Sequence, residues 1–378
     1  MSQPDPTATV PRSTTGASRG RKWALRALKT IVILLVVWFV RGTLAKAWHQ
    51  LGRQSLQIQP GWLAAAGAIY LLGLLPAAVF WGRVLRAMGQ EVGWWDVFRA
   101  YYIGHLGKYV PGKAMVVILR AGLVRGTRAA TSLAAASVFY ETLSMMAVGA
   151  CLAAGALALR LRDQHALVLL ALGLMAASGL PTLPPVFRRL ARWAGVGRSD
   201  KTLHDRLDRI GLAVLLEGWI AMTLSWLALA LSLWATLRAM GMASCDLAAH
   251  WTDYLACVTL SMVAGFASLI PGGLGVRDGI LLSLLSRLLT LGALQATAAS
   301  ALLRLVWLVA ELVGSAILYA AGRWRAGSSP GAAAPSAPGG ALAVPSAPPH
   351  APEARPKPSE PPAPAGAPAR PTHPGTSP

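Results

Sequence analysis

The chain has 378 residues, of which 54% are hydrophobic and only 13% are charged. A soluble domain carries roughly 25% charged residues, so this composition excludes an ordinary soluble protein and favours one that lies in a lipid bilayer. The formal net charge is +20. The basic residues stand in short segments beside apolar runs, which is typical of cytoplasmic loops near anionic lipid, and no nucleic-acid partner is expected.

Composition divides the chain into three regions. Residues 1–21 form a polar, basic arm, and residues 326–378 form a tail of Pro, Ala, Gly and Ser. Neither segment can bury enough apolar surface to order itself, so both are expected to be disordered, with the tail in the cytoplasm. Residues 22–325 contain the apolar runs and form the expected membrane domain.

Eight apolar runs in this domain predict transmembrane helices, at residues 30–40, 61–85, 131–159, 165–183, 210–237, 252–270, 279–291 and 295–321. The first run could belong to a signal peptide with a cleavage site at Ala45-Lys46-Ala47, but the cations Arg41 and Lys46 separate the apolar run from that site, which favours an uncleaved helix. The seventh run has about 13 apolar residues where a straight span needs about 20, which fits half of a broken helix.

The basic segments predict the orientation of these helices. All of them fall on one side of the predicted membrane, which predicts that both termini are cytoplasmic: the segments are 19–29, 120–128, 188–209 and 323–325. The predicted fold is therefore an all-α membrane protein, a polytopic helical bundle of about eight transmembrane segments. Re-entrant or broken helices are expected at two Pro-Gly elements.

The first Pro-Gly element lies between Tyr101 and Arg128. Its Gly107–Lys113 stretch nearly fits a nucleotide-binding GxxxxGK loop, but Ala114 follows instead of a hydroxyl residue and no strand precedes it, which favours a chance match. Pro111 lacks an amide hydrogen and Gly112 is flexible, so a helix must break here. Broken backbone at membrane depth must be buried in protein or line a wet cavity.

Cations surround this first break. Lys108, beside Tyr109, and Lys113 flank it, and Arg120 lies seven residues after Lys113 on the same helical face, at the start of a basic cytoplasmic loop. An anionic lipid headgroup is the natural ligand for such a group. The alternative is that these cations only extend to the membrane interface.

The second Pro-Gly element, LIPGGLGVRDG, spans Leu269–Gly279 and is irregular by composition. Two interpretations remain open: a second helix break opposite the first, which exposes helix ends to a phosphate, or a cytoplasmic turn with a surface ion pair. A span with an intramembrane charge follows each break, which hints at two related halves. The residues of interest here are Pro271, Gly272, Gly273, Gly275, Arg277 and Asp278.

Three ionisable residues fall inside predicted spans. Glu141 lies in the middle of the third span, and Arg304 and Glu311 share one face of the eighth, with Trp307 between them. Facing lipid, a charge at the helix centre costs about 2.5–3.5 kcal/mol, so all three should face the protein interior. The carboxylates could balance charge or relay protons. The alternative is a structural salt bridge from Arg304 or Glu311 to Glu141 or Arg277.

No other feature indicates catalysis or a cofactor. No His, Cys and carboxylate spacing indicates a metal site, and no GxSxG, HExxH or paired catalytic carboxylates are present. No catalytic residue, metal or cofactor is therefore assigned, and an enzyme is not expected. The three cysteines form no CxxC pair and are expected to be packing residues.

KYVPGK at 108–113, Arg120, Glu141 and the LIPGGLGVRDG element before an Arg-bearing last span together resemble the lysylphosphatidylglycerol synthase transmembrane-region family, also described as flippase-like or UPF0104-type. The resemblance covers about residues 22–325 and implies a multi-helix inner-membrane protein. In two-domain relatives this region is implicated in moving aminoacylated phosphatidylglycerol between leaflets, while a separate soluble domain transfers the aminoacyl group. Here the C-terminal tail is of low complexity, so the resemblance does not imply synthase activity. Asp278 stands where the family pattern is expected to have Glu.

The leading hypothesis is a translocator that passes an anionic or zwitterionic lipid headgroup along a polar path. Lys108, Lys113, Arg120 and Arg277 would attract the phosphate. Membrane lipids are the expected partners, together with a possible second copy of the chain and a possible lipid-modifying enzyme. Two alternatives are a membrane transferase with a lipid-linked donor and a non-transporting scaffold that recruits a partner through its Pro-rich tail.

Overall fold

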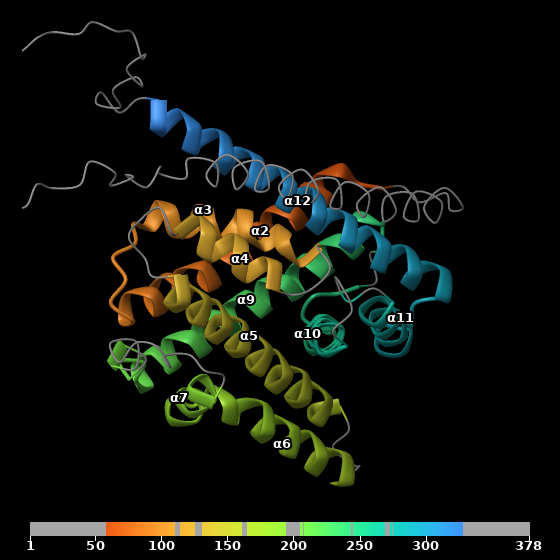
Figure 1. Cartoon of the computed structure of the whole chain (residues 1–378). Helices are drawn as coiled ribbons and strands as arrows, with labels where there is room; N and C mark the ends of the chain where they lie inside the picture. The colour runs from red at the N-terminus through yellow and green to blue at the C-terminus, as the bar shows by residue number, and fades with distance from the viewer. Residues whose placement is uncertain are drawn as a thin grey trace, which may run out of the picture. The chain divides into compact units, whose positions relative to one another are not determined.

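The computed structural model describes residues 58–109, 114–124, 131–160, 165–193, 205–206, 208–242, 245–268, 273 and 275–327. Throughout these ranges the secondary structure is helical and contains no strand, which confirms the all-α class (Figure 1). Several sequence predictions lie outside the described residues: the N-terminal arm, the first apolar run, Pro111, Gly112, Lys113, Pro271, Gly272 and the C-terminal tail.

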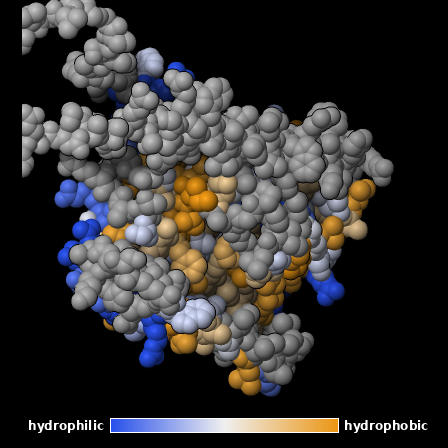
Figure 2. Space-filling view, viewed as in Figure 1, coloured by the Kyte–Doolittle hydropathy of each residue, from blue (hydrophilic) through white to orange (hydrophobic). Residues whose placement is uncertain are grey.

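Within that part of the chain, four helices are long and apolar enough to cross a membrane: α2 (Pro60–Ala87), α5 (Thr131–Arg160), α9 (Leu212–Ala239) and α12 (Ala293–Gly327). They confirm four of the predicted spans. At about 1.5 Å per residue even the shortest exceeds the ~30 Å hydrocarbon core. Along α9 an exposed apolar residue recurs every four positions, at Leu212, Leu216, Ile220 and Leu224, which is a lipid-facing stripe. Figure 2 shows hydrophobic residues over much of the coloured surface.

The first Pro-Gly element lies between two short helical arms that pack antiparallel. One arm is α3 (Trp94–His105) with the 3-10 turn η1 (Leu106–Tyr109), and the other is α4 (Ala114–Val124). A Cβ atom at Gly104 would overlap the Arg120 side chain, and one at Gly107 would lie 2.7 Å from the Val116 backbone nitrogen. In each of these two contacts the residues lie about equally far along the sequence from residue 112, which is the pattern of two antiparallel arms. We call α3, η1 and α4 the first hairpin.

The second Pro-Gly element has the same form. Its arms are α10 (Trp251–Ala267) and α11 (Val276–Leu288). A Cβ atom at Gly265 would lie 2.8 Å from Cβ of Arg277, so the arms meet about a midpoint at residue 271. Gly273 and Gly275 have φ angles of +64° and +81°, a left-handed conformation that glycine adopts without strain. We call α10 and α11 the second hairpin.

The two hairpins change the predicted helix count. From sequence, the first Pro-Gly element is predicted to be a break, whereas the arms of the second are predicted as the sixth and seventh spans. The structure shows one hairpin at each element, so both predicted breaks are present and the number eight is not established. A hairpin returns the chain to the side from which it came, whatever depth it reaches.

The long helices and hairpins form two inverted halves. The first half is α2, the first hairpin and α5; the second is α9, the second hairpin and α12. Each half repeats the contacts of the other: α5 packs on α10 as α12 packs on α3, and α4 packs on α5 as α11 packs on α12. α2 and α9 run antiparallel, since Gln59 N donates to Ala239 O at 2.9 Å while Arg83 pairs with Glu217 at the other end, also at 2.9 Å. The two halves predicted from sequence are therefore related in structure, and they run in opposite directions across the membrane.

Between the halves, α6 (His165–Gly179) returns along α5 and is followed by the 3-10 turn η3 (Leu180–Thr182) and by α7 (Pro184–Trp193) (Figure 1). With 15 residues, α6 is about 22 Å long. The predicted fourth span is thus a shorter α-helix than expected. Phe187 fixes α7 to α5, because its ring lies 4.4 Å from that of Tyr140.

Arginines gather at one end of the helices, where α2 ends and α9 begins. Arg188 pairs with Asp208 at 3.4 Å, and Arg206 donates to Gly89 O at 3.2 Å. Arg86 lies 3.6 Å from the ring centre of Trp94 and Arg325 lies 4.2 Å from that of Trp95, which brings the end of α12 to the same place. This arginine-rich end consists of Arg83, Arg86, Arg188, Arg206, Arg209 and Arg325. It confirms that two of the predicted basic segments, 188–209 and 323–325, have arginines on one side; segment 19–29 lies outside the described residues.

Candidate functional site

The hairpins meet at the middle of α2 and α12. Lys108, near the turn of the first hairpin, pairs with Glu311 of α12. Arg277, near the turn of the second, lies 4.8 Å from the ring centre of Trp307, about one helical turn from Glu311. Tyr70 of α2 donates to Glu311 and stacks on Trp307 at 4.7 Å. The resulting charge cluster is largely buried and contains Tyr70, Tyr101, His105, Lys108, Tyr109, Arg120, Glu141, Arg277, Asp278, Arg304, Trp307 and Glu311.

Glu311 is the carboxylate at the centre of this cluster, with 2% of its surface exposed. Its Oε1 atom accepts hydrogen bonds from the Tyr70 hydroxyl and the Lys108 ammonium, and lies 3.8 Å from Nε2 of His105. Its Oε2 atom is buried and has no hydrogen-bond partner among the described residues. The Tyr109 hydroxyl also interacts with this carboxylate. An oxygen without a well-formed hydrogen bond is costly in a buried carboxylate.

Glu141 is fully satisfied. Arg120 donates to its Oε2 atom at 2.7 Å and the Tyr101 hydroxyl donates to its Oε1 atom at 2.9 Å. Both members of the ion pair are 2% exposed, and the Arg120 guanidinium lies 3.8 Å from the ring centre of Tyr101. Each charge of the pair is thus matched at close range, so removing either partner would leave an uncompensated buried charge.

The position of Arg120 corrects a sequence prediction. We expected it at the start of a basic cytoplasmic loop, but it lies within α4, which continues to Val124, and its side chain is buried. Two features hold it inside: Gly104 leaves room for the side chain between the arms, and Glu141 supplies the opposite charge. Arg125 and Arg128 lie outside the described residues.

His105 connects the two ion pairs and was not predicted. Its Nδ1 atom lies 3.4 Å from Arg120 Nη2, and its Nε2 atom lies 3.4 Å from the Tyr70 hydroxyl. Because a guanidinium only donates, Nδ1 must accept and Nε2 carries the proton. The spacing from Tyr101 to His105 is one helical turn, a signal that could have placed both on the inner face of α3. Tyr70 stands in an apolar run and carried no such signal.

Arg304 pairs with Asp278 at 2.9 Å and joins α12 to α11. Arg304 and Glu311 do face the interior, as predicted. The partners proposed for them were wrong, because Asp278 and Lys108 take the places that we gave to Glu141 and Arg277. The interpretation of the second Pro-Gly element as a turn with a surface ion pair is also wrong, since Arg277 is buried.

Arg277 is the one cation of the cluster without a carboxylate partner among the described residues. It is 8% exposed, its Nε atom is buried without a hydrogen-bond partner in the described part of the chain, and it forms no ion pair there. The other three cations of the cluster, Lys108, Arg120 and Arg304, are each paired with a carboxylate. The cluster therefore keeps one unmatched positive charge, and a guanidinium in this state is suited to bind an anion such as a phosphate.

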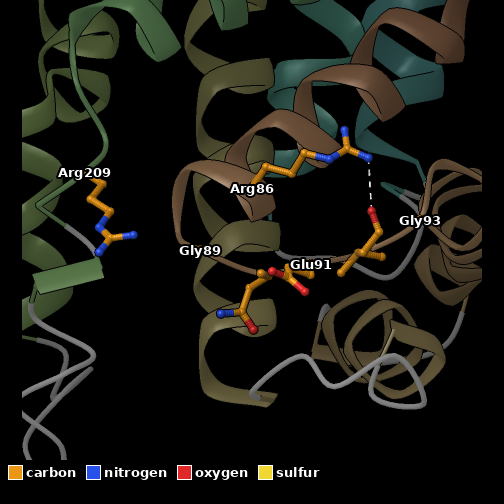
Figure 3. A pocket seen from close by; sticks show the side chains of 7 residues that line it. Arg86, Gly89, Glu91, Gly93 and Arg209 are labelled. Atoms are coloured by element: carbon orange, nitrogen blue, oxygen red, sulfur yellow. Dashed lines mark hydrogen bonds between the residues drawn. The ribbon is translucent and has the colours of Figure 1, made fainter.

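A second basic feature lies at the arginine-rich end, well apart from the cluster. There a pocket of about 700 Å³ lies between the α2–α3 turn and the segment before α9 (Figure 3). Arg86 and Arg209 approach it from opposite sides, and Arg86 Nη2 is held by Val92 O at 3.0 Å. Arg86 follows Tyr70 by sixteen residues of α2, a rise of about 24 Å from the level of the cluster.

The described residues contain no group of three His, Cys, Asp or Glu side chains that could hold a metal ion. Cys151, Cys245 and Cys257 are free and buried, as expected for packing residues.

Comparison with known proteins adds the family. A family model described as the lysylphosphatidylglycerol synthase TM region matches residues 26–314, which are 289 of the 378 residues. No curated protein matches the chain. The match includes both hairpins and the whole charge cluster. The chain is an integral, multi-pass membrane protein that belongs to the lysylphosphatidylglycerol synthase TM region family.

Proposed function

We propose that this protein binds the phosphate of a lipid headgroup at Arg277 and moves the headgroup between the two leaflets. The observation that carries the proposal is the buried guanidinium of Arg277, which no carboxylate among the described residues matches. A buried charge without a partner is expensive, and inside a membrane it marks a functional site by default. The abundant anion within reach is the phosphodiester of a phospholipid.

The hairpins support a path for this headgroup. Their described arms bring Lys108 and Arg277 to the same part of α12, at Glu311 and Trp307. Irregular backbone at membrane depth is tolerated where it is buried in protein or lines a polar cavity. Two hairpins of opposite direction around one site are the arrangement that alternating access needs.

The arginine-rich end supports an orientation. Lys and Arg accumulate on the cytoplasmic side of membrane proteins, so we assign this end, and with it both termini, to the cytoplasm of a cell with this protein in its inner membrane. The pocket with Arg86 and Arg209 would then attract anionic headgroups before they enter. In this proposal the lipid leaves with the covalent structure with which it entered.

The test is a leaflet-sidedness assay with purified protein in vesicles that contain a fluorescent phosphatidylglycerol. Arg277→Gln removes the unmatched charge and is expected to slow translocation at least tenfold. Arg83→Gln is the matched control, because Arg83 forms an exposed pair with Glu217 away from the cluster, and it should stay within twofold of the unmodified protein. Equal rates for the Arg277→Gln variant and the unmodified protein would overturn the proposal.

A further inference from the structure

The pocket at the arginine-rich end is a basic site that is separate from the charge cluster. It has a volume of about 700 Å³ and is lined by Arg86, Arg209 and the turn at residues 89–93 (Figure 3). Arg86 stands in the last turn of α2, whereas Arg209 comes from the segment that leads into α9. The pocket therefore lies between the two inverted halves, and a ligand in it would contact both.

A third guanidinium, that of Arg206, reaches the same turn. Its Nη1 atom donates to the carbonyl oxygen of Gly89 at 3.2 Å. Gly89 has a φ angle of +70°, and arginines surround the place where a side chain would stand: Nη1 of Arg209 lies 3.3 Å and Nη1 of Arg206 lies 3.6 Å from its Cβ position. Two positive groups beside one glycine repel each other, and an anion between them would remove that repulsion.

These three arginines form no ion pair with a described carboxylate. Two of them donate to backbone carbonyl oxygens, which carry no net charge. Two other arginines of the same end, Arg83 and Arg188, do pair with carboxylates. Glu91 is the one carboxylate that lines the pocket, and it is exposed; Asp96 stands behind Gly93 in the first turn of α3, where it offsets the helix dipole. The pocket therefore has a surplus of positive charge.

We propose that this pocket is a binding site for a phosphate monoester, held by Arg86, Arg206 and Arg209. A phosphate monoester carries about −1.5 to −2 charges near neutral pH and presents three acceptor oxygens, which suits guanidiniums that approach from different directions. The inference goes beyond the proposed function, in which the pocket only attracts headgroups on their way to Arg277, and it does not depend on translocation. Phosphatidic acid and soluble glycerol phosphate both carry this group, and the experiment distinguishes them.

Binding is measured by isothermal titration calorimetry on the full chain in detergent micelles. Glycerol phosphate and a short-chain phosphatidic acid serve as separate probes, and the part of the binding that Arg209→Gln removes is assigned to the pocket. Binding of glycerol phosphate would support a site for the phosphate group itself, and binding of phosphatidic acid alone would support a site for a lipid monoester. The corresponding diester, glycerophosphoglycerol or a short-chain phosphatidylglycerol, should bind in the pocket at least about fivefold more weakly, because it carries less charge.

Arg209→Gln removes an exposed guanidinium and should weaken monoester binding about tenfold. Arg83→Gln is the matched control: it lowers the charge of the same end equally, but Arg83 does not line the pocket and pairs with Glu217, so binding should stay within about twofold. Equal losses in both variants would overturn the inference, because binding would then follow overall charge. Failure of both probes to bind, or a diester bound as tightly as its monoester, would also overturn it. So would binding that Arg277→Gln abolishes and Arg209→Gln leaves intact, since the ligand would then belong to the charge cluster.

Discussion

Each hairpin packs an arginine of its second arm against a glycine of its first arm, but only one of the two arginines is paired with a carboxylate among the described residues. In each, a glycine of one arm leaves room for an arginine of the other: Gly104 faces Arg120, and Gly265 faces Arg277. Arg120 is matched by Glu141, whereas Arg277 has an aromatic ring beneath it and no carboxylate among the described residues. The backbone geometry therefore does not decide the role of the arginine. The partner on the following long helix does.

A single exchange of charge explains this difference. In each hairpin one ion pair, here called a tie, joins the second arm to the long helix that follows. The first hairpin supplies the cation of its pair, whereas the second hairpin supplies the anion. The first tie runs from Arg120 to Glu141, and the second runs from Asp278 to Arg304. Because Asp278 makes the tie in the second hairpin, its neighbour Arg277 is released from a structural role and is available to a ligand.

The largest effect should come from breaking the tie of the first hairpin. Arg120→Gln leaves Glu141 buried without its counter-ion, which costs about 3–5 kcal/mol of unfolding free energy. Arg277→Gln removes an unmatched charge and should leave stability unchanged or raised. Thermal unfolding of both variants in detergent measures the contrast. Equal losses of stability would show that both arginines are structural.

Removing both partners of that tie sharpens the same comparison. The double variant Arg120→Gln, Glu141→Gln should recover most of the stability that the single Arg120 variant loses, because a neutral amide pair leaves no uncompensated charge. A double-mutant cycle on unfolding midpoints gives the coupling. Additive losses would mean that the buried pair in the structure does not hold the fold together.

The close approaches of the arms should give effects of intermediate size. Gly104→Ala and Gly265→Ala each insert a methyl group where the opposite arm leaves no room, at a cost of about 1–3 kcal/mol for overpacking. Gly122→Ala is the control on α4, since nothing lies within 4 Å of its Cβ position. It should be neutral or slightly stabilising. Unfolding measurements that rank all three variants alike would contradict the packed hairpins.

The tie of the second hairpin should give the smallest effect. The side chain of Asp278 is 33% exposed, so its pair with Arg304 is partly solvated. We expect Asp278→Asn to cost below about 1 kcal/mol of unfolding free energy. A loss as large as that of Arg120→Gln would place both ties in the same buried class and remove the asymmetry between the hairpins.

Local chemistry made several of these features predictable. Pro111 and Pro271 indicated the breaks, long apolar runs indicated the four crossing helices, and the cost of charge in lipid placed Glu141, Arg304 and Glu311 inside. The ion-pair partners were not predictable, because they join helices far apart in the chain. Arg120 shows why: from sequence it begins a basic stretch, and only the fit against Gly104 and the reach of Glu141 bring it into the core.

The antiparallel seam of α2 and α9 has a consequence for the resting state of the molecule. In a pair of inverted repeats, exchanging the conformations of the two copies would turn an inward-open form into an outward-open form, and for identical copies these two forms would be related by a two-fold axis and equal in energy. Here the units differ in a few charges at their hairpins. In the proposed translocation cycle those side chains would make the two forms unequal in energy, so a handful of residues would set which form the empty protein prefers.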